Sequence, residues 1–358
     1  MGTIACCNEI RSYKTENTYI YQINRYVKYN DKDSKLLPDS QRDTISSLSG
    51  KDNEEKNNIK KKNSKKQYLK NKNGDFLILS YDVEEEYFLE YKITIPIIRT
   101  IEGMSELNIN KKLILCGISP KQKNEGSFLF KIDLEKKAYE DEEHNNVEVL
   151  INSIFPHIYP SLIYDKSGKI LCIGGKRQIQ CESYNLNKNK WLTLPQLHEE
   201  RYKCSLCLDS KGNYVYLFGG INSNINTSVA NDAQIKILRL NLHRLLIWEN
   251  LIIKNSSKNL FINRISSAAF TFKFDEDFIF IVGGEDLNGN QLDNILRFSI
   301  KKLKFESTGA RLKSKAIFLN QNGVSMNEQA HCLIDNFNEI HIIERHDCLP
   351  MDYHPDEI

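Results

Sequence analysis

The chain is most constrained by a short apolar run that ends in glycine and returns at long intervals. These runs are Leu113–Gly117, Ile170–Gly175, Val215–Gly220 and Ile279–Gly284. Their final glycines are separated by 58, 45 and 64 residues. A sequence that repeats with a period of about 50 residues predicts one supersecondary unit built several times, because a single unit cannot bury its apolar face alone.

An aromatic residue recurs at a nearly fixed distance in the second half of the units. Trp191 lies seven residues after Tyr184, Phe305 lies seven after Phe298, and Trp248 lies eight after Leu240. The order of features in each unit predicts a strand, a glycine pair, a second strand, a tight turn and an aromatic-anchored strand. The repeated units therefore predict an all-β protein.

The stretch between residues 173 and 220 resembles the kelch repeat. It carries a glycine pair, a tyrosine and a tryptophan at fixed distance, Leu-Pro, an arginine and the next glycine pair. These are Gly174, Gly175, Tyr184, Trp191, Leu194, Pro195, Arg201, Gly219 and Gly220. The resemblance covers residues 75 to 345, although the first and last units lack glycines. It implies a six-bladed kelch-type β-propeller, with units beginning near residues 76, 107, 156, 199, 262 and 326.

Closure of such a ring is predicted to involve the N-terminal region. The last unit has room for its inner strands only, and Tyr19–Tyr26 is a strand-like segment with no neighbour in sequence. We therefore expect this segment to be the outer strand of the last blade, since closure removes exposed sheet edges. The predicted organisation is a tail with a closing strand (1–30), a disordered polar linker (31–70) and the propeller (71–358), because the linker is too polar to bury a core.

Composition restricts the partners and the compartment. The formal net charge is +2, so no overall field favours nucleic acid. No run of 18 apolar residues occurs, and the nine cysteines are irregularly spaced. Cys204 and Cys207 would lie on opposite faces of a strand, which disfavours a zinc knuckle. We expect a monomeric cytoplasmic protein with reduced thiols.

Charged side chains recur at one register of the predicted blades. Arg99, His157, Arg201 and Arg264 lie 18 to 20 residues before the final glycine of their units. This spacing predicts an arc around the mouth of the axial channel, where guanidinium groups would bind an acidic peptide or a phosphorylated partner. The alternative is that each is a structural residue that bonds backbone or acidic groups between blades. The function predicted from the sequence is a protein-interaction scaffold.

An enzyme would need a nucleophile and base or a metal set at informative spacing, and the sequence offers neither. We expect no catalytic residues, no metal and no cofactor. The alternative function is a sugar-active or copper-dependent oxidase, because some propellers with kelch-like blades are copper enzymes. The tail from His346 to Glu357 gathers histidine, cysteine and acidic residues, but flexible ends of this kind usually bind nothing specific.

The extreme N-terminus resembles that of dually acylated proteins. Gly2 is placed for a myristoyl chain, and Cys6 and Cys7 for palmitoyl chains. The sixth position holds Cys6 where the acylation signal prefers serine or threonine. One acyl chain binds membranes marginally, so the arrangement requires a second signal. The two interpretations are a peripheral anchor on the cytoplasmic face of a membrane and an unmodified tail.

Overall fold

The computed structural model describes residues 19–24, 74–82, 87–95, 102–118, 126–133, 147–222, 237–253, 264–286, 288–318 and 323–348. Apart from the 3₁₀ turn η6 (His346–Cys348), every regular element in these ranges is a β-strand. The predicted all-β class is therefore confirmed for this part of the chain. No helix in these ranges is long and apolar enough to cross a bilayer. The predicted disordered linker lies outside the described residues.

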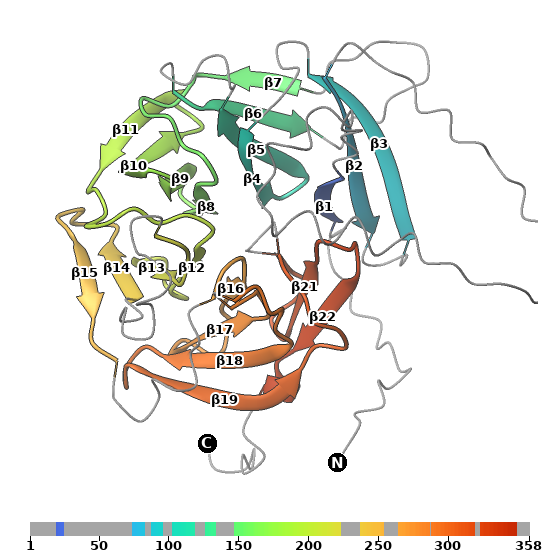
Figure 1. Ribbon diagram of the computed structural model, residues 1–358, viewed down its shortest axis with the longest axis vertical. Coiled ribbons are helices and arrows are strands. Elements are labelled where there is room, and N and C mark those ends of the chain that lie inside the picture. Colours follow the sequence, from blue (N-terminus) through green and yellow to red (C-terminus); the bar gives the residue numbers. More distant parts are fainter. Residues whose placement is uncertain are drawn as a thin grey trace, which may run out of the picture.

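The described strands form a β-propeller in which five blades follow one another along the chain (Figure 1). Four blades are four-stranded antiparallel sheets and the fifth has three strands. The strands are β4 (Glu102–Ile109), β5 (Lys112–Ile118), β6 (Phe128–Asp133) and β7 (Val147–Leu150); β8 (Ser161–Tyr164), β9 (Lys169–Gly175), β10 (Gln178–Asn185) and β11 (Lys190–Leu194); β12 (Ser205–Leu208), β13 (Tyr214–Phe218), β14 (Ile237–Asn241) and β15 (Trp248–Leu251); β16 (Ala268–Phe270), β17 (Phe278–Val282), β18 (Asn294–Ser299) and β19 (Lys304–Arg311); and β20 (Val324–Ser325), β21 (Ala330–Ile334) and β22 (Ile340–Glu344).

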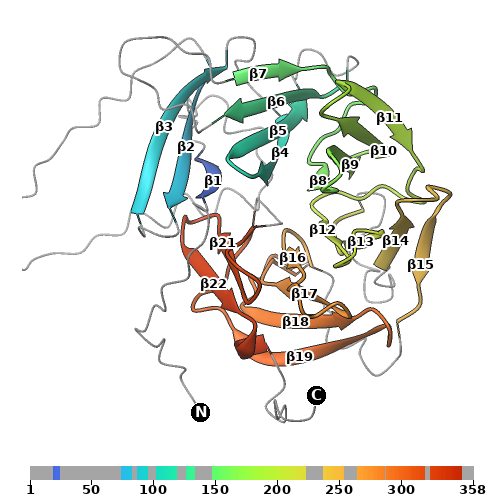
Figure 2. The ribbon, with the colours of Figure 1, turned by 180° about the vertical axis from the view of Figure 1, so that it is seen from behind.

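The predicted number of six kelch-type blades is wrong, because the unit expected near residue 76 is not a repeat of the others. It supplies only two strands, β2 (Gly74–Asp82) and β3 (Tyr87–Ile95). These join β1 (Tyr19–Asn24) in a three-stranded sheet that stands between the first and last blades (Figures 1 and 2). The ring is therefore five successive blades and a closing sheet assembled from two distant segments.

The predicted pairing of the N-terminal strand is also corrected. β1 was expected on the outside of the last blade, but it pairs antiparallel with β2, from Tyr19 opposite Asp82 to Asn24 opposite Leu77. It also lies beside β4 and β21. A lone β2–β3 hairpin would leave the inner edge of β2 unpaired, and β1 covers that edge. The last blade keeps three strands among the described residues.

The glycine pairs are required by the contact between one blade and the next. In the third blade, Gly219 has φ +61°, and a Cβ atom there would lie 2.0 Å from the carbonyl oxygen of Arg264. The N–H group of Gly220 donates to that same oxygen at 2.8 Å. Gly174–Gly175 with Arg201 and Gly283–Gly284 with Ala316 repeat both contacts. Only glycine combines the left-handed conformation with this close backbone approach.

The aromatic spacing corresponds to direct cross-strand pairing. Tyr184 lies opposite Trp191 with ring centroids 5.1 Å apart, and the rings of Phe298 and Phe305 make the same pair at the same distance. The additional residue before Trp248 enlarges the β14–β15 turn, while Trp248 still pairs with Leu240. Such pairs stabilise a hairpin and bury large apolar area.

Two series of hydrogen bonds join successive blades around the axis. In the first, backbone N–H groups donate to the preceding blade: Tyr159 to Gly103, Lys203 to Tyr159, Ser266 to Lys203 and Phe318 to Ser266. In the second, serine hydroxyls of inner strands donate to the following blade: Ser105 to Pro160, Ser161 to Cys204 and Ser205 to Ser267. Each link satisfies polar groups that the crowded axis would otherwise bury unpaired.

Strand direction gives the ring two faces. The link face carries the segments that lead from each blade into the next, together with the β9–β10, β13–β14 and β17–β18 connections. The turn face carries the first and third turns of each four-stranded blade. Backbone bonds hold these two turns together, as Leu186 to Gly168, Leu242 to Asn213 and Ile300 to Asp277 show.

The apolar core lies between neighbouring blades, and the thiols are part of it. Cys204 and Cys207 belong to different core clusters on opposite sides of β12, as their spacing predicted. All seven cysteines of the described residues are unpaired and buried. Burial raises the pKa of the Cys181 and Cys204 thiols to about 12. These thiols are therefore packing groups that stay protonated at neutral pH.

Candidate functional site

Three of the four residues predicted to bind a partner share one structural contact. The side chains of His157, Arg201 and Arg264 each donate to the carbonyl oxygen of the first glycine in their own blade's pair. The distances are 2.6 Å to Gly174, 3.2 Å to Gly219 and 2.9 Å to Gly283. The three side chains therefore occupy equivalent positions in their blades, as their spacing in the sequence predicted. All three side chains are buried, so the structure gives them the geometry of braces, and direct binding stays a prediction.

Arg99 lies outside the described residues. The backbone series around the axis places Gly103 where the later units have Tyr159 and Lys203. His157 and Arg201 lie two residues before those positions, so their counterpart in the first unit is position 101. Counting back from the final glycine gave position 99 instead, because a β-bulge near Gly103 at the start of β4 changes the spacing in this unit.

His157 belongs to a fully buried polar group. Its Nδ1 faces the Gly174 carbonyl, which can only accept, and its Nε2 lies 2.8 Å from Glu182 Oε2. Both side chains are completely buried. Glu182 also accepts hydrogen bonds from the backbone N–H groups of Ile154 and Phe155. The pair ties the link segment before β8 to strand β10 of the same blade.

The two arginines differ in how their charge is compensated. Arg201 pairs with Glu199, with Nη2 2.7 Å from Oε1. Arg264 is fully buried and donates to the carbonyl oxygens of Gly283 and Asn294 and to Asn294 Oδ1. Burial lowers the pKa of Arg264 to about 10. Among the described residues no carboxylate lies within 4.0 Å of it, and its Nε–H has no acceptor.

The link face presents a second group of side chains directly beside these braces. Tyr159 and Tyr202 have ring centroids 6.5 Å apart, and Lys203 Nζ lies 5.7 Å from the centroid of the Tyr159 ring. Burial, helped by Glu200 and Tyr159, raises the pKa of the Tyr202 hydroxyl. The β9–β10 connection joins this group, because Lys176 donates its N–H to Ile158. All are at least partly exposed.

Sequence reasoning missed this cluster, which we call the link-face cluster (Tyr159, Tyr202, Lys203 and Lys176). The signal was available, because Tyr159 and Lys203 stand two residues after His157 and Arg201. The spacing of charged residues pointed to His157 and Arg201, which are buried, and not to Tyr159 and Lys203, which are partly exposed. Aromatic rings with a cation above them provide a surface for polar and anionic partners.

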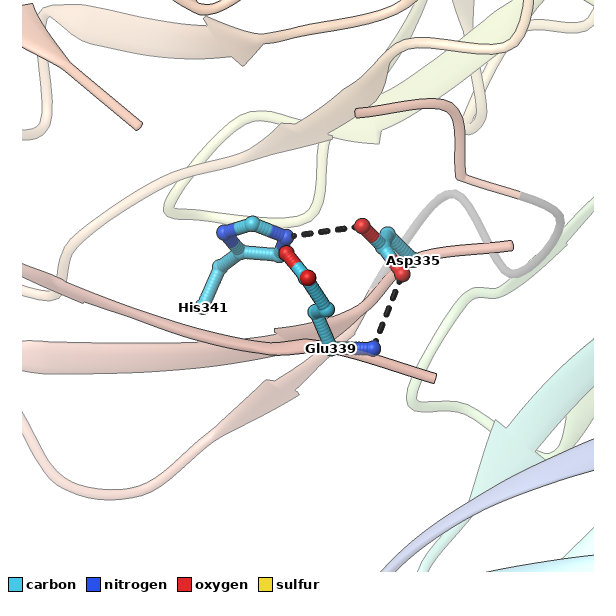
Figure 3. A group of neighbouring side chains, drawn as sticks. All are labelled: Asp335, Glu339 and His341. Atoms are coloured by element: carbon cyan, nitrogen blue, oxygen red, sulfur yellow. Dashed lines mark hydrogen bonds and ion pairs between the residues drawn. The ribbon is translucent and has the colours of Figure 1, made fainter. Parts of the chain in front are cut away.

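Asp335, Glu339 and His341 form the most metal-like group among the described residues (Figure 3). His341 Nε2 lies 3.1 Å from Asp335 Oδ2. Asp335 Oδ1 accepts the N–H groups of Phe337 and Glu339, which closes the β21–β22 turn. Asp165 closes the β8–β9 turn through the same two kinds of contact, to Ser167 and Lys169. The shared geometry shows that Asp335 holds a turn in place.

The metal-like residues of the C-terminal tail are only partly described. Glu344, His346 and Asp347 form an exposed group whose ligand atoms lie within 4.8 Å of one another. Cys348 is buried against the last two blades, and burial raises its thiol pKa to about 12. Residues 352–357 lie outside the described residues. So do Gly2, Cys6 and Cys7, for which acylation stays a prediction.

Comparison with known proteins gives no relative to reason from. No protein-family model matches the chain, and no curated protein matches it.

Proposed function

We propose that this protein is a kelch-type interaction scaffold that binds an acidic partner protein or peptide on its link face. The carrying observation is the link-face cluster, in which two tyrosine rings and a lysine above one of them come from two successive links, and Lys176 comes from the β9–β10 connection bonded to the first of these links. Tyrosine supplies contact area at low entropic cost, and lysine supplies attraction for carboxylates. The chain acts as a cytoplasmic monomer in this proposal.

The buried side chains of His157 and Arg201 support the link-face cluster and are not part of its surface. Lys203 and Tyr159 are held by the backbone series around the axis, and Arg201 and His157 fix the same segments from below. A rigid scaffold that carries exposed loop residues is the usual way in which a propeller-like fold positions a binding surface. The brace arrangement therefore favours a pre-formed site over one assembled on binding.

The oxidase alternative depends on a metal. In the Asp335–Glu339–His341 group, Asp335 has a structural role, because it closes the β21–β22 turn. We therefore propose that this group does not hold a catalytic metal. Metal analysis of the purified full chain separates the two functions. Stoichiometric copper or zinc, lost on His341→Gln, would support the enzyme.

The binding proposal is tested by capture of partners from the cell in which the protein is made. Lys203→Glu and Tyr159→Ala should each reduce capture, whereas Arg244→Glu on the turn face should not. Removing one hydrogen bond to a charged group weakens binding by about 1.5–3 kcal/mol, so the affinity should fall at least about tenfold. Equal capture by the wild type and the three variants, with unchanged melting temperatures, would reject the link face as the binding surface.

The N-terminal sequence supports a membrane address for the scaffold. Gly2 with Cys6 and Cys7 would supply two acyl signals, which stable anchoring requires. Gly2→Ala should then lower the fraction of the protein that sediments with membranes.

A further inference from the structure

The β14–β15 turn differs from its counterparts in the neighbouring blades. It spans residues 242–247, whereas the β10–β11 and β18–β19 turns each have four residues. Asn241 Oδ1 accepts the N–H groups of His243 and Arg244, as Asn185 does for the two residues at the same place in its turn. The turn thus begins normally, and the register of its strands leaves one additional residue before Ile247 and Trp248.

The additional position, Leu246, and the next one, Ile247, are occupied by large apolar side chains that face solvent. Leu246 is 72% exposed and Ile247 is 63% exposed. At the position of Ile247, directly before the paired aromatic residue, the neighbouring blades have Lys190 and Lys304 instead. Phe274, in the β16–β17 turn of the next blade, is 56% exposed on the same face of the ring. Bound water at such side chains is released when they enter an apolar medium.

Cations stand on both sides of this apolar group. Lys188 lies in the β10–β11 turn, Arg244 in the β14–β15 turn itself and Lys302 in the β18–β19 turn, and all three are exposed. The acidic residues of the adjacent β16–β17 turn are paired, Glu276 with Lys211 and Asp277 with Lys301. The β14–β15 turn thus belongs to the blade between those of the β10–β11 and β18–β19 turns, and the three turns share one face of the ring (Figures 1 and 2).

We propose that the turn face of these three blades docks on an anionic lipid surface, with Leu246, Ile247 and Phe274 entering the headgroup region. Cations flanking an apolar projection match the two layers of such a surface, since lysine and arginine attract lipid phosphates while the apolar side chains reach the acyl boundary. The link face then points away from the membrane and stays open to a partner. This docking is separate from the N-terminal acylation and from binding on the link face.

Vesicle sedimentation of the full chain carrying Gly2→Ala tests the proposal, because the chain made in bacteria then carries neither a myristoyl nor a palmitoyl group. The probes are phosphatidylcholine vesicles with and without phosphatidylserine. The Gly2→Ala chain should bind the phosphatidylserine vesicles, and adding Leu246→Ser with Ile247→Ser should weaken binding at least about tenfold. Lys188→Glu with Lys302→Glu should abolish the preference for phosphatidylserine.

Ile252→Ser is the matched control, because Ile252 is 84% exposed but follows β15 at the link-face end. It should leave vesicle binding unchanged. Phe274→Ser repeats the test on a second turn in case the double variant does not fold, which melting curves will show. Absence of vesicle binding by the Gly2→Ala chain, or equal loss in Ile252→Ser, overturns the proposal. Loss of a captured protein without any vesicle binding would identify a protein-docking surface instead and also overturns it.

Discussion

Arg264 shows how a residue that looks suited to ligand binding can be used for architecture. Its guanidinium group is fully buried and holds the first glycine of its blade and Asn294 together. A buried cation is expensive to desolvate, and the lowered pKa of Arg264 expresses that cost. Three hydrogen bonds to protein oxygens offset it.

Removing this group should destabilise the fold. Arg264→Ala removes three buried hydrogen bonds, to the carbonyl oxygens of Gly283 and Asn294 and to Asn294 Oδ1, so the free energy of unfolding should fall by about 2–4 kcal/mol. Arg264→Lys should give an intermediate loss, because lysine keeps the charge but lacks the planar fork. Urea denaturation measures both, with exposed Arg244→Ala as the control. A binding defect without any loss of stability would show that Arg264 contacts the partner.

The buried thiols predict a pH dependence. Cys181, Cys204, Cys332 and Cys348 have folded-state pKa values raised to about 12 by burial, from an ordinary value of 9.0. The unfolded chain therefore loses thiol protons first, so the stability present below pH 9 should decline as the pH rises toward 12. Urea midpoints across this range test it. Cys204→Ala should lose stability less steeply than the wild type, and parallel curves would contradict the prediction.

The sequence predicted the register of these residues better than the direction of their side chains. Spacing from the glycine pairs was enough to align His157, Arg201 and Arg264. Which of two nearby residues faces solvent depends on the left-handed conformation of Tyr159 and Lys203, with φ of +54° and +55°. Neither residue type signals that conformation, because it is imposed by the hydrogen bonds between blades.

At the scale of strands and turns, the glycine pair is the element that connects one blade with the next. Gly219 approaches the backbone of Arg264, whereas Gly212 in the β12–β13 turn has open space where a Cβ would lie. Both have positive φ, +61° and +70°. Replacing Gly212 therefore measures the free-energy cost of positive φ alone, whereas replacing Gly219 measures that cost together with the cost of the collision between blades.

Gly212→Ala should lower the free energy of unfolding by about 1 kcal/mol, the cost of a left-handed non-glycine residue. Gly219→Ala should cost at least about 3 kcal/mol or prevent folding, because a Cβ would collide with a backbone oxygen that cannot move aside. Thermal and urea unfolding of the two variants provide the comparison. Equal losses would mean that the interblade contact adds nothing.

Local pattern predicted the strands well because the repeat keeps each hairpin's pairing within a short stretch of sequence. The seven-residue spacing gave the pairs Tyr184 with Trp191 and Phe298 with Phe305 directly. The exposed apolar turn before Trp248 was seen only as one additional residue. Its position on a face between two basic turns is a tertiary fact that spacing within one unit does not contain.

For the molecule as a whole, the least predictable feature was closure. Periodicity suggested six equivalent units, but β2 and β3 lack the glycine pair and receive their inner strand from β1. The pairing partner of an isolated strand cannot be read from its sequence, because β1 is compatible with any open edge of suitable length. The structure shows that it takes the place next to the axis, between β4 and β21.

Two truncations test this closure and the proposed anchor separately. Deleting residues 1–30 removes β1 and should lower the melting temperature by several degrees, since it reopens the sheet edge beside the axis. Deleting residues 1–18 removes Gly2, Cys6 and Cys7 but keeps β1, so it should weaken membrane binding without changing the melting temperature. An unchanged melting temperature after the longer deletion would show that β1 does not stabilise the ring.

The position of β1 also has a consequence for how the protein is made. β1 leaves the ribosome before all five blades, yet one of its two neighbours, β21, belongs to the fifth blade and follows the other four. The five blades can form one after another as the chain emerges, whereas β1 has to wait for the C-terminal blade before it can be enclosed. Ring closure therefore cannot precede the synthesis of β21, and chains in synthesis expose an open seam to chaperones until that strand has been made.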